Sequence, residues 1–265
     1  MAKTSPDGYP TQPFPLQGRV AIITGGSRGI GKAISLHLSS LGAKVVINYT
    51  SNSTQAEQLA SQINANSSAQ QAAAVKADIS QPEQVKLLFD EAESAFNGVH
   101  ILVNSAGVLD SKYPVIGETT IEDFDNVISV NVRGAFLVCK EASNRIKHGG
   151  GGRIICLSSS LVGASRPGYG AYTASKAAVE AMVKILAKEL KGTGITANCV
   201  APGPVATELF YAGKTEEMIK GMADACPLGR LGQPEDIAPL VGFLVSDAGE
   251  WINGQIIRAN GGSVI

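Results

Sequence analysis

The order of secondary-structure patterns constrains this chain more than any other feature. From residue 19 onward, short runs of apolar and β-branched residues alternate with longer amphipathic stretches. Such alternation predicts βαβ units, which build a parallel sheet covered by helices. Runs that are apolar throughout, such as VAII and KVVI, fit a sheet buried on both faces. The predicted strands are 19–24, 44–49, 72–79, 100–107, 151–160, 194–203 and 254–262.

We therefore predict an α/β fold class, a single-domain doubly wound (Rossmann-type) seven-stranded parallel sheet with helices on both faces. The domain is expected to span residues 18–265, after an irregular, proline-containing N-terminal arm at residues 1–17. No linker, internal repeat or low-complexity tract divides the chain. Ser80 and Glu83, three residues apart before an amphipathic run, predict a capping box at the start of a helix.

Composition and charge exclude several classes of function. The chain is 44% hydrophobic and 17% charged, with a net charge of −1 and no basic cluster, so we expect no nucleic-acid partner. No apolar run is long enough to span a membrane. The cysteines and histidines lack metal-ligand spacing, so no metal site is expected. The N-terminus lacks the apolar region of a secretory signal, which predicts a cytoplasmic location, with an organelle such as the plastid as the alternative.

The stretch TGGSRGIGKA, Thr24 to Ala33, nearly matches two different phosphate-binding loops. From Gly26 it reads G-x-x-x-x-G-K, the beginning of a nucleoside-triphosphate loop. That loop needs Ser or Thr after the lysine to coordinate Mg²⁺, and this chain has Ala33 there. Lys32 is therefore predicted to be a solvated residue on a helix.

The second interpretation of this stretch is a dinucleotide turn, and its context fits. It follows a strand and precedes a helix and a second strand. Gly25 permits a sharp turn, Gly29 lets the backbone approach a pyrophosphate, and Gly31 allows the helix to pack closely on the strand. The phosphates of the ligand would meet the N-terminus of the helix.

The end of the second strand distinguishes the two nicotinamide dinucleotides. NAD sites usually carry an acid there, which holds the ribose 2′-hydroxyl and repels a 2′-phosphate. This chain has Asn48, Tyr49, Thr50 and Ser51 instead, while Arg28 in the glycine turn offers a guanidinium for a phosphate. These residues predict NADPH/NADP+ as the cofactor; otherwise Arg28 is only a surface charge.

Tyr172 and Lys176, in the segment YTASK, are the candidate reacting groups. Their i, i+4 spacing places both on one face of a predicted helix. A nearby ammonium stabilises a phenolate and lowers the pKa of the tyrosine, which makes it a usable acid or base. The apolar stripe expected to face the core of this helix is Ala174, Ala177, Ala178, Ala181, Met182, Ile185 and Leu186.

Polar residues at two other strand ends accompany this pair. Ligands of a doubly wound sheet bind beyond the carboxyl ends of its strands. The segments LSSS (157–160) and NSAG (104–107) end the fifth and fourth predicted strands, and a serine there could hydrogen-bond a substrate oxygen. Asn131 could support a proton path from Lys176. Each of these residues alone could equally be a cap or turn residue.

Taken together, these motifs resemble the short-chain dehydrogenase/reductase family, from about Arg19 to the C-terminus. Thr24, Gly25, Gly29 and Gly31 match its cofactor turn T-G-x-x-x-G-x-G. Its N-N-A-G motif is present as NSAG, with Ser105 in place of the second asparagine.

The resemblance implies roles for individual residues. Asn131, Ser159, Tyr172 and Lys176 would form the catalytic tetrad, with Ser158 and Ser160 as alternatives to Ser159. Tyr172 would donate the proton, Lys176 would modulate its pKa and contact the ribose, and Ser159 would hold the substrate oxygen. The residues expected to bind the cofactor are Gly25, Ser27, Arg28, Gly29, Ile30, Gly31, Asn48, Tyr49, Thr50, Ser51, Asp78, Ile79, Asn104, Ala106, Gly107, Tyr172, Lys176, Pro202, Gly203, Val205 and Thr207.

The expected function is an NADPH-dependent reductase that acts on an aldehyde or ketone. The segments INYTSNST and GEWINGQ are similar to the aldehyde reductase-like branch of the family in plants, to fungal polyhydroxynaphthalene reductases and to 3-oxoacyl-carrier-protein reductases. Two alternatives are 3-oxoacyl-carrier-protein reduction, and a catalytically silent NADPH-binding regulatory protein. A mostly apolar pocket, with a lid between Ala206 and Cys226, predicts a hydrophobic or aromatic substrate.

The resemblance also implies self-association, as a homotetramer or a homodimer that pairs the tyrosine-bearing helix with its copy. The ending GGSVI is expected either to join such an interface or to form a frayed tail.

Overall fold

The computed structural model describes residues 14–149 and 151–265, so the boundary of the predicted arm stays a prediction. Parallel strands form one seven-stranded sheet in the order β3-β2-β1-β4-β5-β6-β7, which confirms the predicted doubly wound α/β class. Every predicted strand lies at its expected place in the chain. The strands are β1 (Val20–Thr24), β2 (Lys44–Tyr49), β3 (Ala72–Lys76), β4 (Ile101–Asn104), β5 (Arg153–Leu157), β6 (Thr196–Pro202) and β7 (Ile256–Ala259).

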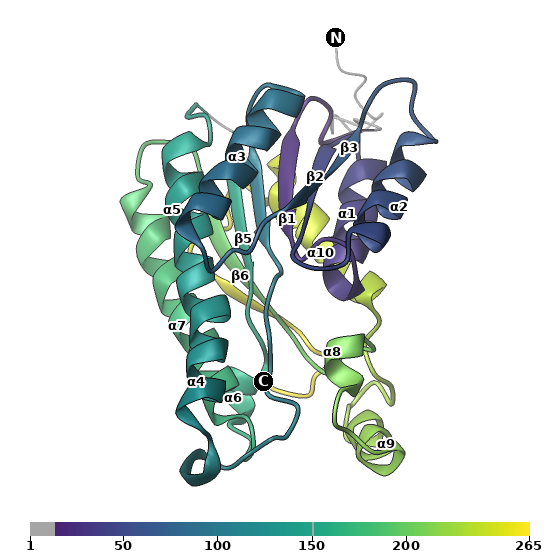
Figure 1. Cartoon of the computed structure of the whole chain (residues 1–265), viewed down its shortest axis with the longest axis vertical. Helices are drawn as coiled ribbons and strands as arrows, with labels where there is room; N and C mark the ends of the chain where they lie inside the picture. Colours follow the sequence, from purple (N-terminus) through teal and green to yellow (C-terminus); the bar gives the residue numbers. More distant parts are fainter. Residues whose placement is uncertain (1–13, 150) are drawn as a thin grey trace.

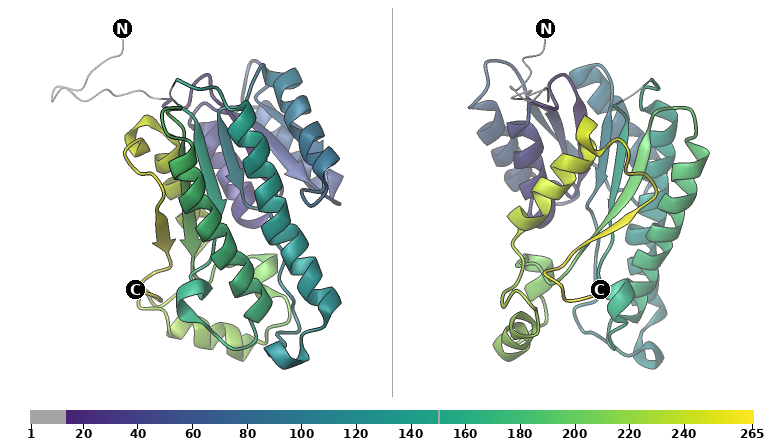
Figure 2. Two further views of the ribbon diagram at one scale, coloured as in Figure 1. Left: turned by 90° about the vertical axis from the view of Figure 1, so that its left-hand side faces the viewer. Right: turned by 180° about the vertical axis from the view of Figure 1, so that it is seen from behind.

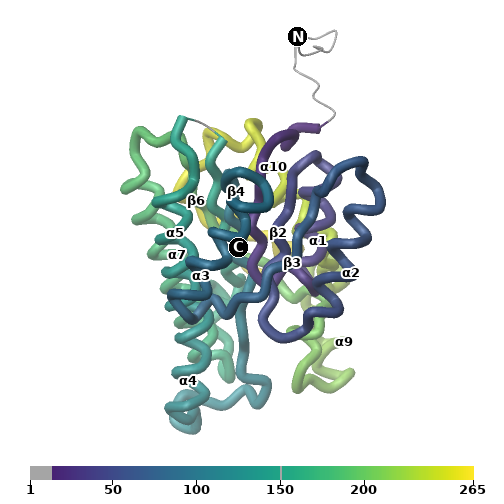
Figure 3. Tube along the Cα trace, turned by 45° about the horizontal axis from the view of Figure 1, so that its top comes forward, coloured from purple at the N-terminus to yellow at the C-terminus, as the bar shows by residue number. Residues whose placement is uncertain are grey.

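Helices cover both faces of the sheet (Figure 1). Apolar residues of α1, α2 and α10 form one buried layer with the strands. Those of α3, α5 and α7 form the other, and Figure 3 shows the two groups on opposite sides of the strands. The main helices are α1 (Gly29–Ser40), α2 (Ser53–Asn64), α3 (Pro82–Phe96), α4 (Ile121–Ile128), α5 (Ala135–Arg145), α7 (Gly170–Glu189) and α10 (Pro234–Val245). Among the described residues, no helix is both long enough and apolar enough to cross a membrane.

The sheet order places a crevice at the carboxyl ends of the strands. The order reverses between β1 and β4, so the chain leaves these neighbours in opposite directions and opens a space between the connecting segments. Short elements surround this end, and Figure 2 shows it opposite the N-terminus. They are η1 (Ile116–Glu118), α6 (Leu161–Ala164), α8 (Glu208–Tyr211) and α9 (Glu216–Asp224). The last two lie within the predicted lid.

The start of α3 differs from the predicted capping box. Its N-cap is Gln81, and Pro82 occupies the first turn. Ser80 does not cap the helix, because its hydroxyl and its backbone N–H both donate to Asp78 Oδ1, at 2.8 and 2.9 Å. Proline suits the first helical position, since its φ is fixed and it has no N–H to satisfy. The helix therefore begins one residue later than the box required.

The buried face of α7 also differs from the predicted apolar stripe. Val179, Val183 and Ala187 pack into the core, on the same face as the buried Lys176. Ile185, which was expected to be buried, is 57% exposed. Small and apolar residues surround much of this helix, so periodicity alone offers two candidate faces. Contact with β6 and α5 decides between them.

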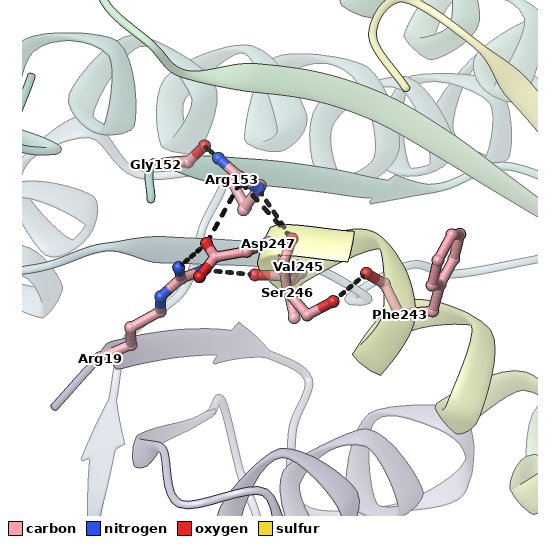
Figure 4. Close-up of polar contacts among 7 residues, drawn as sticks. All are labelled: Arg19, Gly152, Arg153, Phe243, Val245, Ser246 and Asp247. Atoms are coloured by element: carbon pink, nitrogen blue, oxygen red, sulfur yellow. Dashed lines mark hydrogen bonds and ion pairs between the residues drawn. The ribbon is translucent and has the colours of Figure 1, made fainter. Parts of the chain in front are cut away.

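Two arginines fix the opposite end of the sheet to the end of α10 (Figure 4). Arg153 is fully buried and donates to Gly152 O at 2.8 Å and to Ser246 O at 3.4 Å. Arg19 donates to Val245 O at 2.7 Å and forms an ion pair with Asp247. Guanidinium donors therefore satisfy the last carbonyls of α10, which have no partner within the helix. Burial lowers the pKa of Arg153, and the neighbouring Arg19 lowers it further.

Candidate active site

A cavity of about 520 Å³ occupies the crevice at the carboxyl ends of the strands. It extends from the glycine turn after β1, past the ends of β4 and β5, to α7 and the lid segment. Its volume lies within the usual range for small-molecule sites. The residues around it fall into a glycine-rich end and an end that carries Ser159, Tyr172 and Lys176.

The glycine turn brings backbone close to backbone, which only glycine permits. A Cβ on Gly31 would lie 2.2 Å from Gly25 O. Gly25 itself has a φ of +59°, and a Cβ there would lie 3.0 Å from Ala106 Cα. The turn thus packs α1 against β1 and leaves peptide groups facing the cavity, as a pyrophosphate site requires.

Two predicted cofactor ligands lie behind the turn. Asn48 is 1% exposed, accepts a hydrogen bond from Gly25 N at 3.3 Å and donates to Ala77 O at 2.9 Å. Asn104 is buried too, and its Oδ1 accepts from Thr24 Oγ1 at 2.7 Å. Neither residue lines the cavity, so their contact with the cofactor stays a prediction. Both are held by backbone and core groups, and they position the turn.

The structure brings the other predicted cofactor residues together along the cavity. The glycine turn, the end of β2 and the loops after β3, β4 and β6 all contribute. These lining residues are Gly25, Ser27, Arg28, Gly29, Ile30, Gly31, Tyr49, Thr50, Ser51, Asp78, Ile79, Ala106, Gly107, Tyr172, Lys176, Pro202, Gly203, Val205 and Thr207.

The three serines after β5 have different surroundings. Ser158 Oγ donates to Glu180 Oε1 on α7 at 2.6 Å. Ser160 Oγ donates to Ala201 O at 3.1 Å. The hydroxyl of Ser159, in contrast, accepts from Leu161 N at 3.2 Å and lies near enough to Tyr172 to lower the pKa of its phenol. Of the three, Ser159 therefore has the hydroxyl placed to share a substrate oxygen with the tyrosine.

Tyr172 stands in the first turn of α7, at the edge of the cavity. Burial raises the pKa of Tyr172 to about 12, against the smaller effect of the hydrogen bond from Ser159. We expected Lys176 to lower this pKa; in the structure, burial outweighs any such effect. Its ammonium lies 5.6 Å from the centre of the tyrosine ring. The phenol is consequently protonated at neutral pH.

Lys176 and Asn131 are buried side by side beneath this site. Lys176 Nζ donates to Leu157 O at 2.8 Å, and burial lowers the pKa of Lys176 to about 8. Asn131 bonds Val108 through both side-chain atoms, at 2.8 and 2.9 Å, and donates to Ser175 Oγ at 3.0 Å. It does not line the cavity. Asn131 lies in a π-helical turn, η2 (Ser129–Gly134), an irregularity frequent at functional sites.

The lid forms the outer part of the cavity and is tied to the loop after β4. Tyr113 donates to Ala212 O at 2.7 Å and accepts from the ammonium of Lys214, which also lies 4.7 Å from the Phe210 ring centre. Burial lowers the pKa of Lys214 to about 8. The side chains that line this end are mostly apolar: Leu161, Ala164, Tyr169, Leu209, Phe210, Met222 and Val264.

Comparisons with known proteins agree with this geometry. A family model described as enoyl-(acyl carrier protein) reductase matches residues 25–263. A short-chain type dehydrogenase/reductase from Picea abies is 57% identical over 94% of this chain and 93% of its own length. This chain belongs to the short-chain dehydrogenase/reductase family. An Arabidopsis thaliana protein named NADPH-dependent aldehyde reductase-like protein, chloroplastic, is 62% identical over 95% of this chain and 96% of its own length.

Solved structures of the family share the fold. A short-chain dehydrogenase from Burkholderia cenocepacia, in complex with NADP, is 33% identical and superposes with a TM-score of 0.86. The match covers 94% of this chain and 98% of that chain.

Two residues that were not predicted from the sequence, Glu208 and Val264, line the cavity. Glu208 forms an ion pair with Arg28 across its mouth, Nη1 to Oε2, at 2.9 Å. Val264 reaches it from the C-terminal tail, where Asn260 Nδ2 donates to Val264 O at 2.8 Å. The tail therefore lines the crevice, an arrangement that neither prediction for GGSVI included. No local sequence signal marks either residue.

Proposed function

We propose that this chain is an NADPH-dependent reductase that converts an aldehyde or ketone to an alcohol. The observation that carries the proposal is one cavity with two ends. One end has a glycine turn that bears Arg28 and no acid at the end of β2, and the other has Ser159, Tyr172 and Lys176. The first arrangement suits a dinucleotide with a 2′-phosphate, and the second suits proton transfer to a carbonyl oxygen.

The names of relatives support the same cofactor. The Arabidopsis relative carries NADPH and aldehyde reductase in its name, and the Burkholderia structure holds NADP. The residues of this chain fit the group as well, because Gly25 and Gly31 have no side chain where the backbone of the turn packs closely beside the cavity. Bound NADPH would supply the hydride.

The chain's own residues would then hold the carbonyl and provide a proton. Ser159 Oγ–H donates a hydrogen bond to the carbonyl oxygen and orients it against Tyr172. Tyr172 Oη–H transfers its proton to that oxygen as negative charge develops there. Lys176, buried and bonded to Leu157 O, keeps a positive charge near the phenolate that remains. Asn131 holds the loop after β4 against α7 and acts as a positioning residue.

The protonation state of Tyr172 fits the role of proton donor. With a pKa of about 12, this phenol is protonated at neutral pH and can donate its proton to the carbonyl oxygen. The apolar side chains around the outer cavity support a hydrophobic or aromatic carbonyl compound as substrate.

Two other functions make different predictions. A 3-oxoacyl-carrier-protein reductase would prefer thioester substrates, and cations at the outer cavity, Arg166 and Lys214, are compatible with such a partner. A silent regulatory protein would bind NADPH without turnover. The intact set of Ser159, Tyr172 and Lys176 favours an enzyme.

Oxidation of NADPH, with NADH in parallel, tests the proposal against aldehydes, aromatic ketones, quinones and 3-oxoacyl thioesters. We expect turnover of an aldehyde or ketone with a kcat/KM at least tenfold higher for NADPH. Arg28→Ala should reduce this preference about tenfold, because a charge-assisted phosphate contact is lost. Lys86→Ala, which removes an exposed cation of α3 that does not line the cavity, is the matched control. Equal use of NADH by the unaltered protein would contradict the cofactor assignment.

We also propose that the protein assembles as a homotetramer or homodimer through the exposed face of α7. Figure 2 shows α7 beside α5 on the surface of the molecule. Ile185 of α7 and Phe136 of α5 are each more than half exposed. Exposed apolar side chains on neighbouring helices are typical of an interface with a second copy. Ile185→Glu should lower the mass measured by light scattering to that of the monomer, whereas Lys184→Glu should not. A monomeric unaltered protein would contradict the proposal.

For the location of the protein, we propose the plastid, in place of the cytoplasm expected from the sequence. The support is the word chloroplastic in the name of the Arabidopsis relative. Imaging of a fluorescent protein fused to the C-terminus of the full chain tests this.

A further inference from the structure

An ion pair connects the lid to the glycine turn across the mouth of the crevice. Arg28 lies in the turn, and Glu208 is the first residue of α8, at the root of the lid. The two side chains are 69% and 66% exposed. In the described part of the chain, Arg28 has no other carboxylate within ion-pair distance. Both residues line the cavity.

The backbone beneath this pair is in close contact too. A Cβ on Gly29 would lie 3.3 Å from Thr207 Cγ2. Thr207 is the N-cap of α8 and accepts a hydrogen bond from Phe210 N at 3.2 Å. The root of the lid therefore rests on the turn and is joined to it by one ion pair.

The same guanidinium has a second use in the proposed function, on which this inference rests. A 2′-phosphate bound by Arg28 would bring close to two negative charges near the carboxylate of Glu208. Glu208 also lines an adjoining cavity of about 310 Å³, whose other charged residues are Arg28 and Lys32. Among the described residues that line this adjoining cavity, Glu208 is the acidic one, and the others are basic or uncharged. An acid beside a 2′-phosphate repels it, as the acid of an NAD site does.

We propose that Glu208 competes with the 2′-phosphate of NADPH for Arg28, so that cofactor binding releases the root of the lid from the glycine turn. The carboxylate holds the lid to the turn in the free protein and moves away when the phosphate takes the guanidinium. Linkage makes this effect reciprocal. The Arg28–Glu208 ion pair lowers the affinity for the 2′-phosphate by the same factor by which the bound phosphate lowers the equilibrium constant for forming the ion pair.

Two nucleotides that differ only in the phosphate test this idea. Adenosine 2′,5′-bisphosphate carries the 2′-phosphate, and adenosine 5′-monophosphate lacks it. Glu208→Gln should lower the Kd of the bisphosphate about two- to fivefold, the range for an exposed ion pair, and leave that of the monophosphate unchanged. The effect of Glu208→Gln on the Kd of the bisphosphate should diminish near 1 M salt, where exposed charges are screened. Glu217→Gln, which removes an exposed carboxylate from α9 in the same lid, should change neither Kd.

Amide hydrogen exchange measures the release of the lid. In the unaltered protein, residues 207–211 should exchange faster when saturated with the bisphosphate than with the monophosphate. In Glu208→Gln the two nucleotides should give the same rate. An unchanged or raised Kd for the bisphosphate in Glu208→Gln would overturn the competition and indicate that Glu208 orients Arg28. Equal affinity of the unaltered protein for both nucleotides would overturn this inference and the NADPH assignment together.

Discussion

Replacement of Tyr172 by phenylalanine should lower the rate of carbonyl reduction by about 10² to 10⁴, the usual contribution of a general acid. The change removes one oxygen and keeps the ring, so the packing of α7 is preserved. Ser159 can still hold the carbonyl, but no phenol remains to transfer a proton. Steady-state oxidation of NADPH with the best substrate of the panel measures the loss.

Binding of the cofactor separates this effect from a general loss of structure. Tyr172→Phe should bind NADPH with a Kd within a few-fold of the unaltered protein, as followed by the fluorescence of the reduced nicotinamide. Tyr211, an exposed tyrosine of the lid, does not line the cavity, so Tyr211→Phe should keep full activity. A Tyr172→Phe protein with near-normal turnover would show that another group donates the proton.

Replacement of Arg153 by methionine should destabilise the fold by about 2–4 kcal/mol, because its fully buried guanidinium donates charged hydrogen bonds to two carbonyls, and such bonds contribute about 1.5–3 kcal/mol each. The fully buried guanidinium satisfies Ser246 O and Gly152 O, and lies 3.8 Å from Asp247. Methionine fills much of the space but leaves both carbonyls without these donors. Urea unfolding followed by circular dichroism, at one fixed protein concentration, measures the change.

A surface arginine provides the contrast. Arg230 forms an ion pair with Asp236 at 2.5 Å, but its side chain is 52% exposed. Arg230→Met should therefore cost less than about 1 kcal/mol, because water replaces the lost partner. The loss of stability in Arg153→Lys should fall between these two values, since lysine keeps the positive charge but lacks the several N–H donors of the planar guanidinium. Equal unfolding free energies for Arg153→Met and the unaltered protein would contradict the role of the buried arginine.

Much of the candidate site could be predicted because its residues lie in local motifs. The glycine turn follows a strand, and the spacing of Tyr172 and Lys176 is that of one helix face. In such motifs, a short stretch of sequence contains both the functional groups and the residues that fix the local backbone conformation. The resemblance to the family named Ser159, but residue type and position alone could not separate it from Ser158 and Ser160, because all three end the same strand. The partners that engage the other two, Glu180 and Ala201, come from elements distant in the chain.

Other features could not be predicted because they depend on neighbouring elements. Asn48 and Asn104 are polar residues at strand ends, where cofactor ligands are expected. In the structure, the side-chain amide of Asn48 bonds to backbone groups, and that of Asn104 bonds to Thr24. The stripe predicted on α7 is only partly buried, because Met182 and Leu186 pack against the core whereas Ile185 is exposed. In each case the residue type permits two environments, and the neighbouring elements select one.

The sequence by itself determined the strands, the glycine turn and the tyrosine–lysine pair, because hydrophobic periodicity and backbone constraints act over a few residues. Only the tertiary structure decided which partners engage Ser158 and Ser160, which side of α7 is buried and which acid meets Arg28. Those choices depend on contacts between segments such as residues 28 and 208, which are far apart in the chain. Packing of the sheet and its helices brings these segments together, and no local sequence pattern predicts which of them will be in contact.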